Sequence, residues 1–232
     1  LVTGPKAEET LSDLTGESMG QSDFQWLTHK QLIIDGCNVT AIRVSYAGES
    51  GWELHSDMKD VKKIYQAVFA AGQTYNIRHF GMLALDSMRL EKGYRSWKSD
   101  LTSDYTMFES GLSGWVNFQK GDFVGRAALQ SEYNEGSKRK FITLILDDPD
   151  DGQPFGEAVY LSSIQIDGAL SGLVVSSGYG HRVGASIAFG IVNSEALKFD
   201  SIIEVIVLGR TRKAKLAVNN ILYDPENKKL KS

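Results

Sequence analysis

Apolar side chains along the first half of the chain follow two different spacings. Spacing of three to four residues predicts helices over four segments, namely Pro5–Leu14, Asp57–Tyr75, Gly81–Lys92 and Gly125–Tyr133. Shorter runs over Gln31–Ile34 and Cys37–Tyr46 flank Asp35-Gly36 and predict a two-stranded hairpin. Helices interleaved with such hairpins indicate an α+β layer, an antiparallel sheet with helices.

The pattern changes after the polar stretch 134–139. Short strand-like runs follow, punctuated by Gly, Asp and Asn. They are Lys140–Leu146, Glu157–Leu161, Leu170–Val175, Ser186–Val192, Ser201–Leu208 and Thr211–Val218. This spacing predicts a small sandwich or barrel. The sequence therefore predicts two domains, residues 1–137 and residues 138–232.

Composition and charge narrow the class of protein. The 232 residues are 42% hydrophobic and 23% charged, as in ordinary globular proteins, and they contain no membrane-spanning run of about 18 apolar residues. A net charge of -4 argues against a nucleic-acid partner. The single Cys37 excludes an internal disulfide, and a buried strand position is expected for it. The chain starts at Leu1 without an initiator methionine or visible signal peptide, so we expect a piece of a longer polypeptide.

Most catalytic signatures are missing from the sequence. The four histidines lack metal-ligand spacing, so no metal site is expected. Walker loops, G-x-S-x-G elbows and dinucleotide-binding glycine motifs are also absent. Gly178-Tyr179-Gly180 is interpreted as a β-turn, and Trp97 and Trp115 as packed core residues.

The segment 43–55 is the most informative part of the chain. Glu49 and Glu53 stand beside Tyr46 and Trp52, among glycines that permit close backbone approach. A carboxylate can accept two parallel N–H bonds from an amino-pyrimidine edge while an aromatic ring covers the heterocycle. Composition alone favours the alternative, a strand–turn–strand with solvated surface glutamates.

A family resemblance favours ligand binding over solvated surface glutamates for this segment. Residues 46–53 resemble the Y-x-G-E-x-G-x-E signature of the glycine-cleavage T-protein family, which consists of folate-binding aminomethyltransferases. Further segments resemble that family's motifs in the same order, namely 81–93, 108–112, 120–126 and, near the end, the two pieces 172–178 and 186–188. The resemblance covers nearly the whole chain and implies part of the T-protein folate-binding domain followed by its small C-terminal β-barrel.

Two details resemble one branch of the family. Residues 91–102 and Gly178-Tyr179-Gly180-His181 are similar to the folate domains that end flavin-dependent dimethylglycine and sarcosine dehydrogenases. The resemblance implies a domain that accepts a one-carbon unit from an N-methyl amine and forms methylenetetrahydrofolate. Tetrahydrofolate is the implied cofactor, and FAD would belong only to a missing N-terminal portion. An attached or associated flavin-dependent oxidase or dehydrogenase domain is the implied partner.

The resemblance also implies roles for individual residues. The folate-binding residues it implies are Tyr46, Glu53, Leu54 and His55, with Glu53 on the pterin edge and Tyr46 lining the pocket. Glu49 is expected to support the turn instead. Leu85 stands where glycine-cleavage T-proteins carry an arginine, and the dehydrogenase branch of the family also tends to lack that arginine. The family's catalytic aspartate lies upstream of the position matching Leu1, so no catalytic residue is assigned and this fragment alone should be inactive.

Two other functions stay open at this point. Some relatives of this fold bind folate as regulatory, non-catalytic modules, but those carry a cysteine where Asp122 stands. A related demethylase passes the methyl group of a sulfonium substrate to folate, and Trp97 and Trp115 could recognise such a cation. The expected location is cytoplasmic, or the mitochondrial matrix if the source is eukaryotic.

Overall fold

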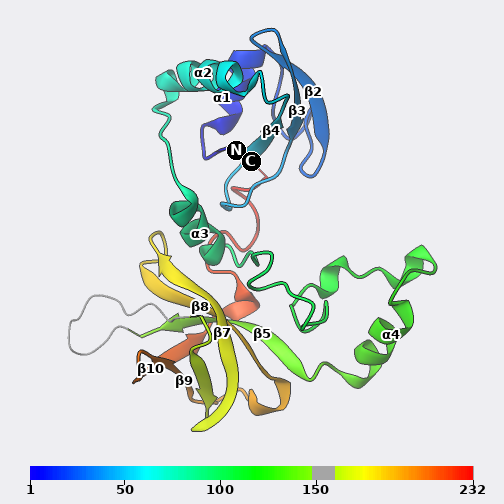
Figure 1. The fold of residues 1–232 in the computed structure, drawn as a ribbon, viewed down its shortest axis with the longest axis vertical. Helices are drawn as coiled ribbons and strands as arrows, with labels where there is room; N and C mark the ends of the chain where they lie inside the picture. The colour runs from blue at the N-terminus through cyan, green and yellow to red at the C-terminus, as the bar shows by residue number, and fades with distance from the viewer. Residues whose placement is uncertain (148–159, 232) are drawn as a thin grey trace. The chain divides into compact units, whose positions relative to one another are not determined.

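The computed structural model describes residues 1–147 and 160–231 (Figure 1). The chain forms two compact units. The first unit is Leu1–Lys92 together with Tyr223–Ser232, and the second is Gly93–Leu222. The two domains predicted from the sequence, residues 1–137 and 138–232, have different boundaries from these compact units. Because compact units and family domains are defined in different ways, that domain division stays a prediction.

The first unit is built on a four-stranded antiparallel sheet with the strand order β1-β4-β3-β2. Its strands are β1 (Val2–Thr3), β2 (His29–Ile34), β3 (Cys37–Ile42) and β4 (Gly51–His55). The predicted hairpin is confirmed, since β2 and β3 pair with Ile34 opposite Cys37. Asp35 and Gly36 both have positive φ, 48° and 74°, which a tight hairpin of this kind requires.

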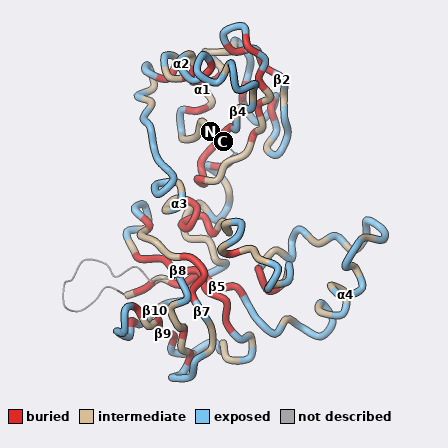
Figure 2. The backbone as a smooth tube through the Cα atoms, viewed as in Figure 1, coloured by how far each residue is buried: buried red, intermediate tan, exposed pale blue. Residues whose placement is uncertain are grey.

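Helices α1 (Ala7–Thr15) and α2 (Val61–Ala71) cover one face of this sheet (Figures 1 and 2). Their buried residues, such as Leu11 and Ile64, pack against strand residues such as Val39 and Trp52 in one apolar core. Because side chains alternate along a strand, Thr40, Ile42, Glu53 and His55 point to the opposite face, where none of them is buried. Cys37 is buried and free, as expected.

Two predicted helices differ from the observed ones in informative ways. The predicted Asp57–Tyr75 helix is α2 followed by a 3-10 turn, η1 (Gly72–Tyr75), which ends at Asn76 with a φ of 57°. Helix α3 (Met82–Glu91) buries only Arg89, Leu90 and Glu91. Leu83 on its first turn is 89% exposed, whereas Leu90 on its last turn is fully buried.

The second unit contains a closed six-stranded antiparallel barrel with the order β10-β5-β8-β7-β6-β9. Its strands are β5 (Arg139–Leu146), β6 (Ser163–Ile166), β7 (Ala169–Gly180), β8 (Ala185–Asn193), β9 (Ile203–Val207) and β10 (Arg210–Leu216). The predicted fold class, an α+β layer and a small β-barrel, is confirmed. Strand β6 was not predicted, and the predicted strand Glu157–Leu161 lies mostly outside the described residues.

Two interpretations of the second unit are wrong. Gly178, Tyr179 and Gly180 end strand β7 instead of forming a β-turn, because they pair with β8 from Ile187 to Ala185 and the chain reverses after them. Trp97 and Trp115 are 76% and 69% exposed instead of core residues. Trp97 precedes a tight turn, in which Lys98 has a φ of 74°, and Trp115 lies in a 3-10 turn, η2 (Ser113–Trp115), that buries no residue.

An arm of short helices precedes the barrel strands (Figure 1). It contains η2, η3 (Phe118–Lys120) and α4 (Arg126–Glu135), and none of these helices has a buried residue. Its order comes from aromatic contacts, in which Phe118 lies 5.9 Å from Tyr133 and 6.4 Å from Phe108 between ring centroids. Several large apolar side chains of this arm are exposed, among them Trp115, Val124 and Tyr133.

Candidate functional site

The segment 43–52 leaves β3 and returns as β4, and a buried arginine fixes its start. Arg43 donates from its guanidinium to the carbonyl oxygens of Met19 and Phe24, at 3.2 and 2.8 Å. The same guanidinium lies 5.0 Å from the centroid of the Trp52 ring. A buried cation needs such partners, because burial alone lowers its pKa, as it does here. The loop is therefore tied at both of its ends.

Two glycines let this loop approach other parts of the first unit. At Gly48, which has a φ of 75°, a Cβ would lie 3.0 to 3.3 Å from three side-chain carbons of Lys92. At Gly51 a Cβ would lie 2.8 Å from Oγ1 of Thr3 on the neighbouring strand β1. Larger side chains at either position would displace their neighbours, so the motif's glycines are explained by close packing.

The two glutamates of the loop region occupy opposite environments. Glu49 is buried, and its Oε1 accepts a hydrogen bond of 2.5 Å from the hydroxyl of Tyr223. The side chain of Glu53 is 48% exposed on the outer face of β4, where its Oε2 lies 3.1 Å from Nε2 of His55. A ligand arriving at the outer face could reach Glu53 but not Glu49.

The structure brings together some of the predicted folate-binding residues. Glu53 and His55 lie side by side on the outer face of β4, and Tyr46 is half-buried in the loop before it. Leu54 points the other way, because it alternates with them, and packs against the core. One ligand on the outer face therefore cannot contact the side chains of Leu54 and Glu53 together.

A cavity of about 520 Å³ lies in the first unit on the Leu54 side. Three stacked rings form part of its wall, with Phe69 and His79 at 4.5 Å between centroids and the hydroxyl of Tyr65 at 2.8 Å from Nε2 of His79. The apolar spacing over Asp57–Tyr75 predicts the helix that carries Tyr65 and Phe69, but no pattern in the sequence predicts this cavity. Its His79 wall is set by residues 76–81, which have no regular structure from which to predict it.

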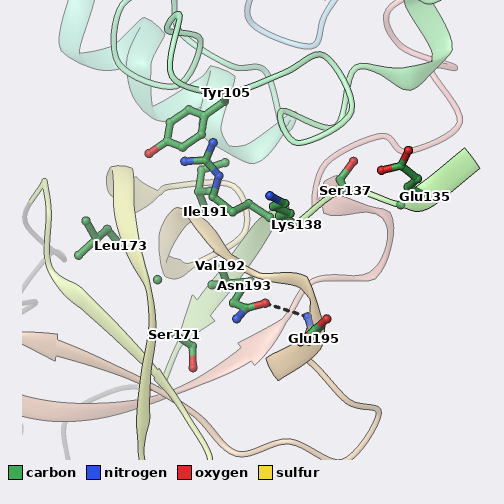
Figure 3. A pocket seen from close by; sticks show the side chains of 13 residues that line it. Tyr105, Glu135, Ser137, Lys138, Ser171, Leu173, Ile191, Val192, Asn193 and Glu195 are labelled. Atoms are coloured by element: carbon green, nitrogen blue, oxygen red, sulfur yellow. Dashed lines mark hydrogen bonds between the residues drawn. The ribbon is translucent and has the colours of Figure 1, made fainter. Parts of the chain in front are cut away.

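A second cavity of about 830 Å³ lies at the rim of the barrel, in the second unit (Figure 3). Leu173, Ile191 and Val192 supply its apolar lining, and Lys138 supplies a cation. Arg139 also lines this cavity, but its guanidinium is paired with Glu109. Among the described residues, neither this cavity nor the first is lined by Tyr46, Glu53 or His55.

Arg139 is held by the carboxylate of Glu109. Its Nε and Nη2 donate to the two carboxylate oxygens at 2.9 and 3.0 Å, and its guanidinium lies 4.8 Å from the Tyr105 ring centroid. Burial acts to raise the pKa of Glu109, but the bonds from Arg139 and the Thr106 N–H outweigh it and the pKa is lowered. The same contact raises the pKa of Arg139. This ion pair fastens the start of β5 and leaves Arg139 with little capacity for a ligand.

No group of three or more His, Cys, Asp or Glu side chains in residues 1–147 and 160–231 is placed to hold a metal ion. Within the same residues, no helix is long and apolar enough to cross a membrane. Helix α3 carries an ion pair, since Nε of Arg89 donates to Oδ1 of Asp86 at 2.7 Å.

Comparison with known proteins gives the same fold and a related group of enzymes. The chain is 36% identical over 210 residues to human mitochondrial dimethylglycine dehydrogenase, covering 90% of this chain and 24% of that protein. It is 31% identical to mitochondrial sarcosine dehydrogenase of Mus musculus, covering 99% of this chain and 25% of that protein. Identity is 28% with the aminomethyltransferase of Caldanaerobacter subterraneus subsp. tengcongensis, of which the chain covers 57%.

A solved structure shares the architecture. The crystal structure of glycine cleavage system aminomethyltransferase T from Bartonella henselae superposes with a TM-score of 0.74 at 20% identity. The match covers 94% of this chain and 58% of that one, so it supports the fold alone. The chain thus spans about a quarter of the two dehydrogenases and less than two thirds of the aminomethyltransferases it matches.

Two family models match consecutive parts of the chain. The GCVT N-terminal domain matches residues 1–120, about half of the chain, and the glycine cleavage T-protein C-terminal barrel domain matches residues 139–224. The second range contains the observed barrel. Motifs, fold and relatives agree, and the chain belongs to the glycine cleavage T-protein family of aminomethyltransferase-type domains.

Proposed function

We propose that this chain is part of a tetrahydrofolate-binding domain that accepts a one-carbon unit from an N-methyl amine of the dimethylglycine or sarcosine type. The product would be methylenetetrahydrofolate. Support comes from family membership and from relatives named as dimethylglycine and sarcosine dehydrogenases. In this proposal the flavin that oxidises the amine belongs to a different part of the protein or to an associated one.

The observation that carries the proposal is the position of the Glu53 carboxylate. It lies on a paired strand, is half-exposed, and has His55 as a neighbour at 3.1 Å. A ligand that presents two adjacent N–H donors, as an amino-pyrimidine does, can bind both oxygens of such a carboxylate. A rigid strand holds that acceptor with little loss of conformational entropy on binding.

The surrounding residues fit a flat, partly apolar ligand at this face. Tyr46 is half-buried in the adjoining loop, and Ile42 is the pairing partner of Glu53 on β3. Glu53, His55 and Tyr46 are therefore our proposed binding residues. A contact from Leu54 would have to be made on the other side of the sheet.

Chemistry would depend on residues that this chain does not supply. A bound tetrahydrofolate provides the nitrogen nucleophiles that take up the one-carbon unit. The residues described here would bind and orient it, and orientation alone can contribute several kcal/mol to lowering a barrier. The family's aspartate has no counterpart among them, so we propose that the chain binds folate but does not turn over a substrate by itself.

The decisive experiment measures tetrahydrofolate affinity. Tryptophan fluorescence is recorded while tetrahydrofolate is added to this chain and to a version extended upstream, with Glu53→Gln compared in each. Loss of a charge-assisted acceptor should weaken binding about tenfold or more. Glu17→Gln is the matched control, because Glu17 is exposed in the same unit and its side chain makes no hydrogen bond or ion pair with the described residues. Equal affinity of Glu53→Gln and the parent chain would overturn the assignment.

One observation favours a second candidate, demethylation of a sulfonium substrate. Trp97 and Trp115 expose most of their surface, and exposed indole rings attract cations. Assays of the full-length protein with dimethylglycine, sarcosine and a dimethylsulfonium compound separate the candidates. Turnover of the sulfonium compound alone, reduced by Trp97→Leu, would select the second candidate over the first.

A further inference from the structure

The last residues of the chain return to the loop that contains the family signature. Residues 223–230, here called the tail segment, contact the first unit although they follow the barrel in sequence. The N–H of Tyr223 donates to the carbonyl oxygen of Glu91 at 2.9 Å. Its hydroxyl donates to the buried Glu49, which is 174 positions away. A buried carboxylate of the signature loop is thus satisfied by the tail segment.

Asp224 is a second point of attachment. Its Oδ2 lies 3.2 Å from Nζ of Lys92, and its backbone carbonyl accepts from the same ammonium at 2.5 Å. The side chains of Lys92 and Asp224 are only 1% and 6% exposed. Asp224 also accepts from the backbone N–H groups of residues 228 and 229, at 2.9 and 3.1 Å, which folds the tail segment into a compact turn.

Lys92 transmits this attachment to the loop. Its aliphatic carbons lie where a Cβ at Gly48 would come within 3.0 to 3.3 Å. Residues 47–51 are all buried, and β4 with Glu53 follows them directly. The loop 47–51 therefore packs against the side chain of Lys92 at Gly48, and it is hydrogen-bonded to Tyr223 through Glu49. In turn, Tyr223 is contacted by Lys229, whose Nζ lies 2.8 Å from the hydroxyl.

We propose that the tail segment positions the folate-binding strand, with Tyr223 and Asp224 as positioning residues and Glu49 as their anchor in the loop. The proposal rests on the function proposed above, since it concerns the same site. It assigns the first glutamate of the signature, Glu49, to an intramolecular contact with Tyr223 and leaves Glu53 as the group for the ligand. A merely stabilising tail would strengthen the unit as a whole without a specific effect on residues 47–51.

Hydrogen exchange tests the contact without any ligand. Tyr223→Phe removes only the hydroxyl, and backbone amides of residues 47–51 should exchange about tenfold faster, as expected for a bond to a charged group. Amides of β3 should keep their protection. Tyr133→Phe, a tyrosine with no hydroxyl bond among the described residues, is the control and should change neither region. Unchanged exchange at 47–51 in Tyr223→Phe would overturn the proposal.

Tetrahydrofolate affinity tests the positioning role. The dissociation constant is measured for the upstream-extended protein, Tyr223→Phe, Glu49→Gln and the double variant. We expect each single variant to weaken binding about fivefold to tenfold, and the double variant to be no weaker than either single, because both remove one contact. Additive losses would contradict coupling through this bond.

The two readouts keep the proposals separate. Absence of tetrahydrofolate binding in every protein would reject the proposed function, while faster exchange at residues 47–51 would still establish the attachment of the tail segment. Normal binding by Tyr223→Phe together with faster exchange would reject positioning and retain the folate site.

Discussion

The two units of the chain differ in how many charged side chains they bury, five in residues 43–92 and three among the described residues of the second unit, namely Asp100, Glu109 and Arg212. The barrel's core cluster consists entirely of Ile, Leu, Val and Ala side chains. The first unit also has an apolar core, yet residues 43–92 bury five charged side chains, namely Arg43, Glu49, Arg89, Glu91 and Lys92. Apolar contacts are tolerant of small shifts, whereas buried charges require their partners at defined positions. Buried charges are therefore more numerous around the candidate site of the first unit than in the second unit, whose largest core cluster is apolar.

Breaking the buried ion pair should have the largest effect. Lys92→Met keeps most of the side-chain volume but leaves the carboxylate of Asp224 buried without its cation. The first unit should lose about 3–5 kcal/mol, because the desolvation cost of that charge remains. Hydrogen exchange of β3 amides against β8 amides measures the two units separately, and β8 should be unaffected. Lys62→Met, an exposed lysine on α2, serves as the control.

A double variant makes the comparison sharper. Lys92→Met combined with Asp224→Leu replaces the whole pair by apolar groups, which is often neutral or stabilising. Stability of the first unit should therefore recover, while tetrahydrofolate affinity of the extended protein should not, if the pair defines geometry. Recovery of both properties would show that the polar contacts are needed only for folding.

A cavity in the barrel should have the next largest effect. Leu144 is fully buried in the barrel's apolar cluster. Leu144→Ala should lower the stability of β8 by about 2–5 kcal/mol, from lost transfer free energy and the cavity left behind. Leu208→Ala, at a site that is 79% exposed, is the control. Equal loss of protection in β3 would contradict the idea that the units respond separately.

Much of the fold follows from the sequence, because its signals are local. Asp35-Gly36 predicted the β2–β3 hairpin, since few other dipeptides accept positive φ at both positions. Five barrel strands were predicted from short apolar runs. Strand β6 was missed because it has only four residues, Ser163–Ile166, next to a turn at Asp167 and Gly168.

The candidate site could be predicted only in part. Side chains alternate along a strand, so Leu54 lies on the same face as the buried Trp52, and Glu53 and His55 lie on the opposite face. This separation of Leu54 from Glu53 and His55 could therefore be predicted from the sequence. The burial of Glu49 and its hydrogen-bond partner could not be predicted from the sequence. The partner of Glu49 is Tyr223, which is 174 positions away in the sequence. Hydrophobic periodicity relates only residues that are near in sequence, so it does not predict this contact.

Lowering the pH should produce the smallest of these losses of stability, and the loss should be confined to the first unit. Burial acts to raise the pKa of Asp224, but its bonds to Lys92 and to the N–H groups of the tail segment outweigh this, and the pKa is lowered from its ordinary value of 3.8. A carboxylate with a lowered pKa in the folded state stabilises the protein above its unfolded pKa, and this stability is lost as the pH falls through the folded value. Protection of β3 amides should therefore decline below about pH 4 more steeply in the parent chain than in Asp224→Asn. Parallel pH profiles would mean that Asp224 gains nothing from its ionised state, and the attachment of the tail segment would then rest on Tyr223 alone.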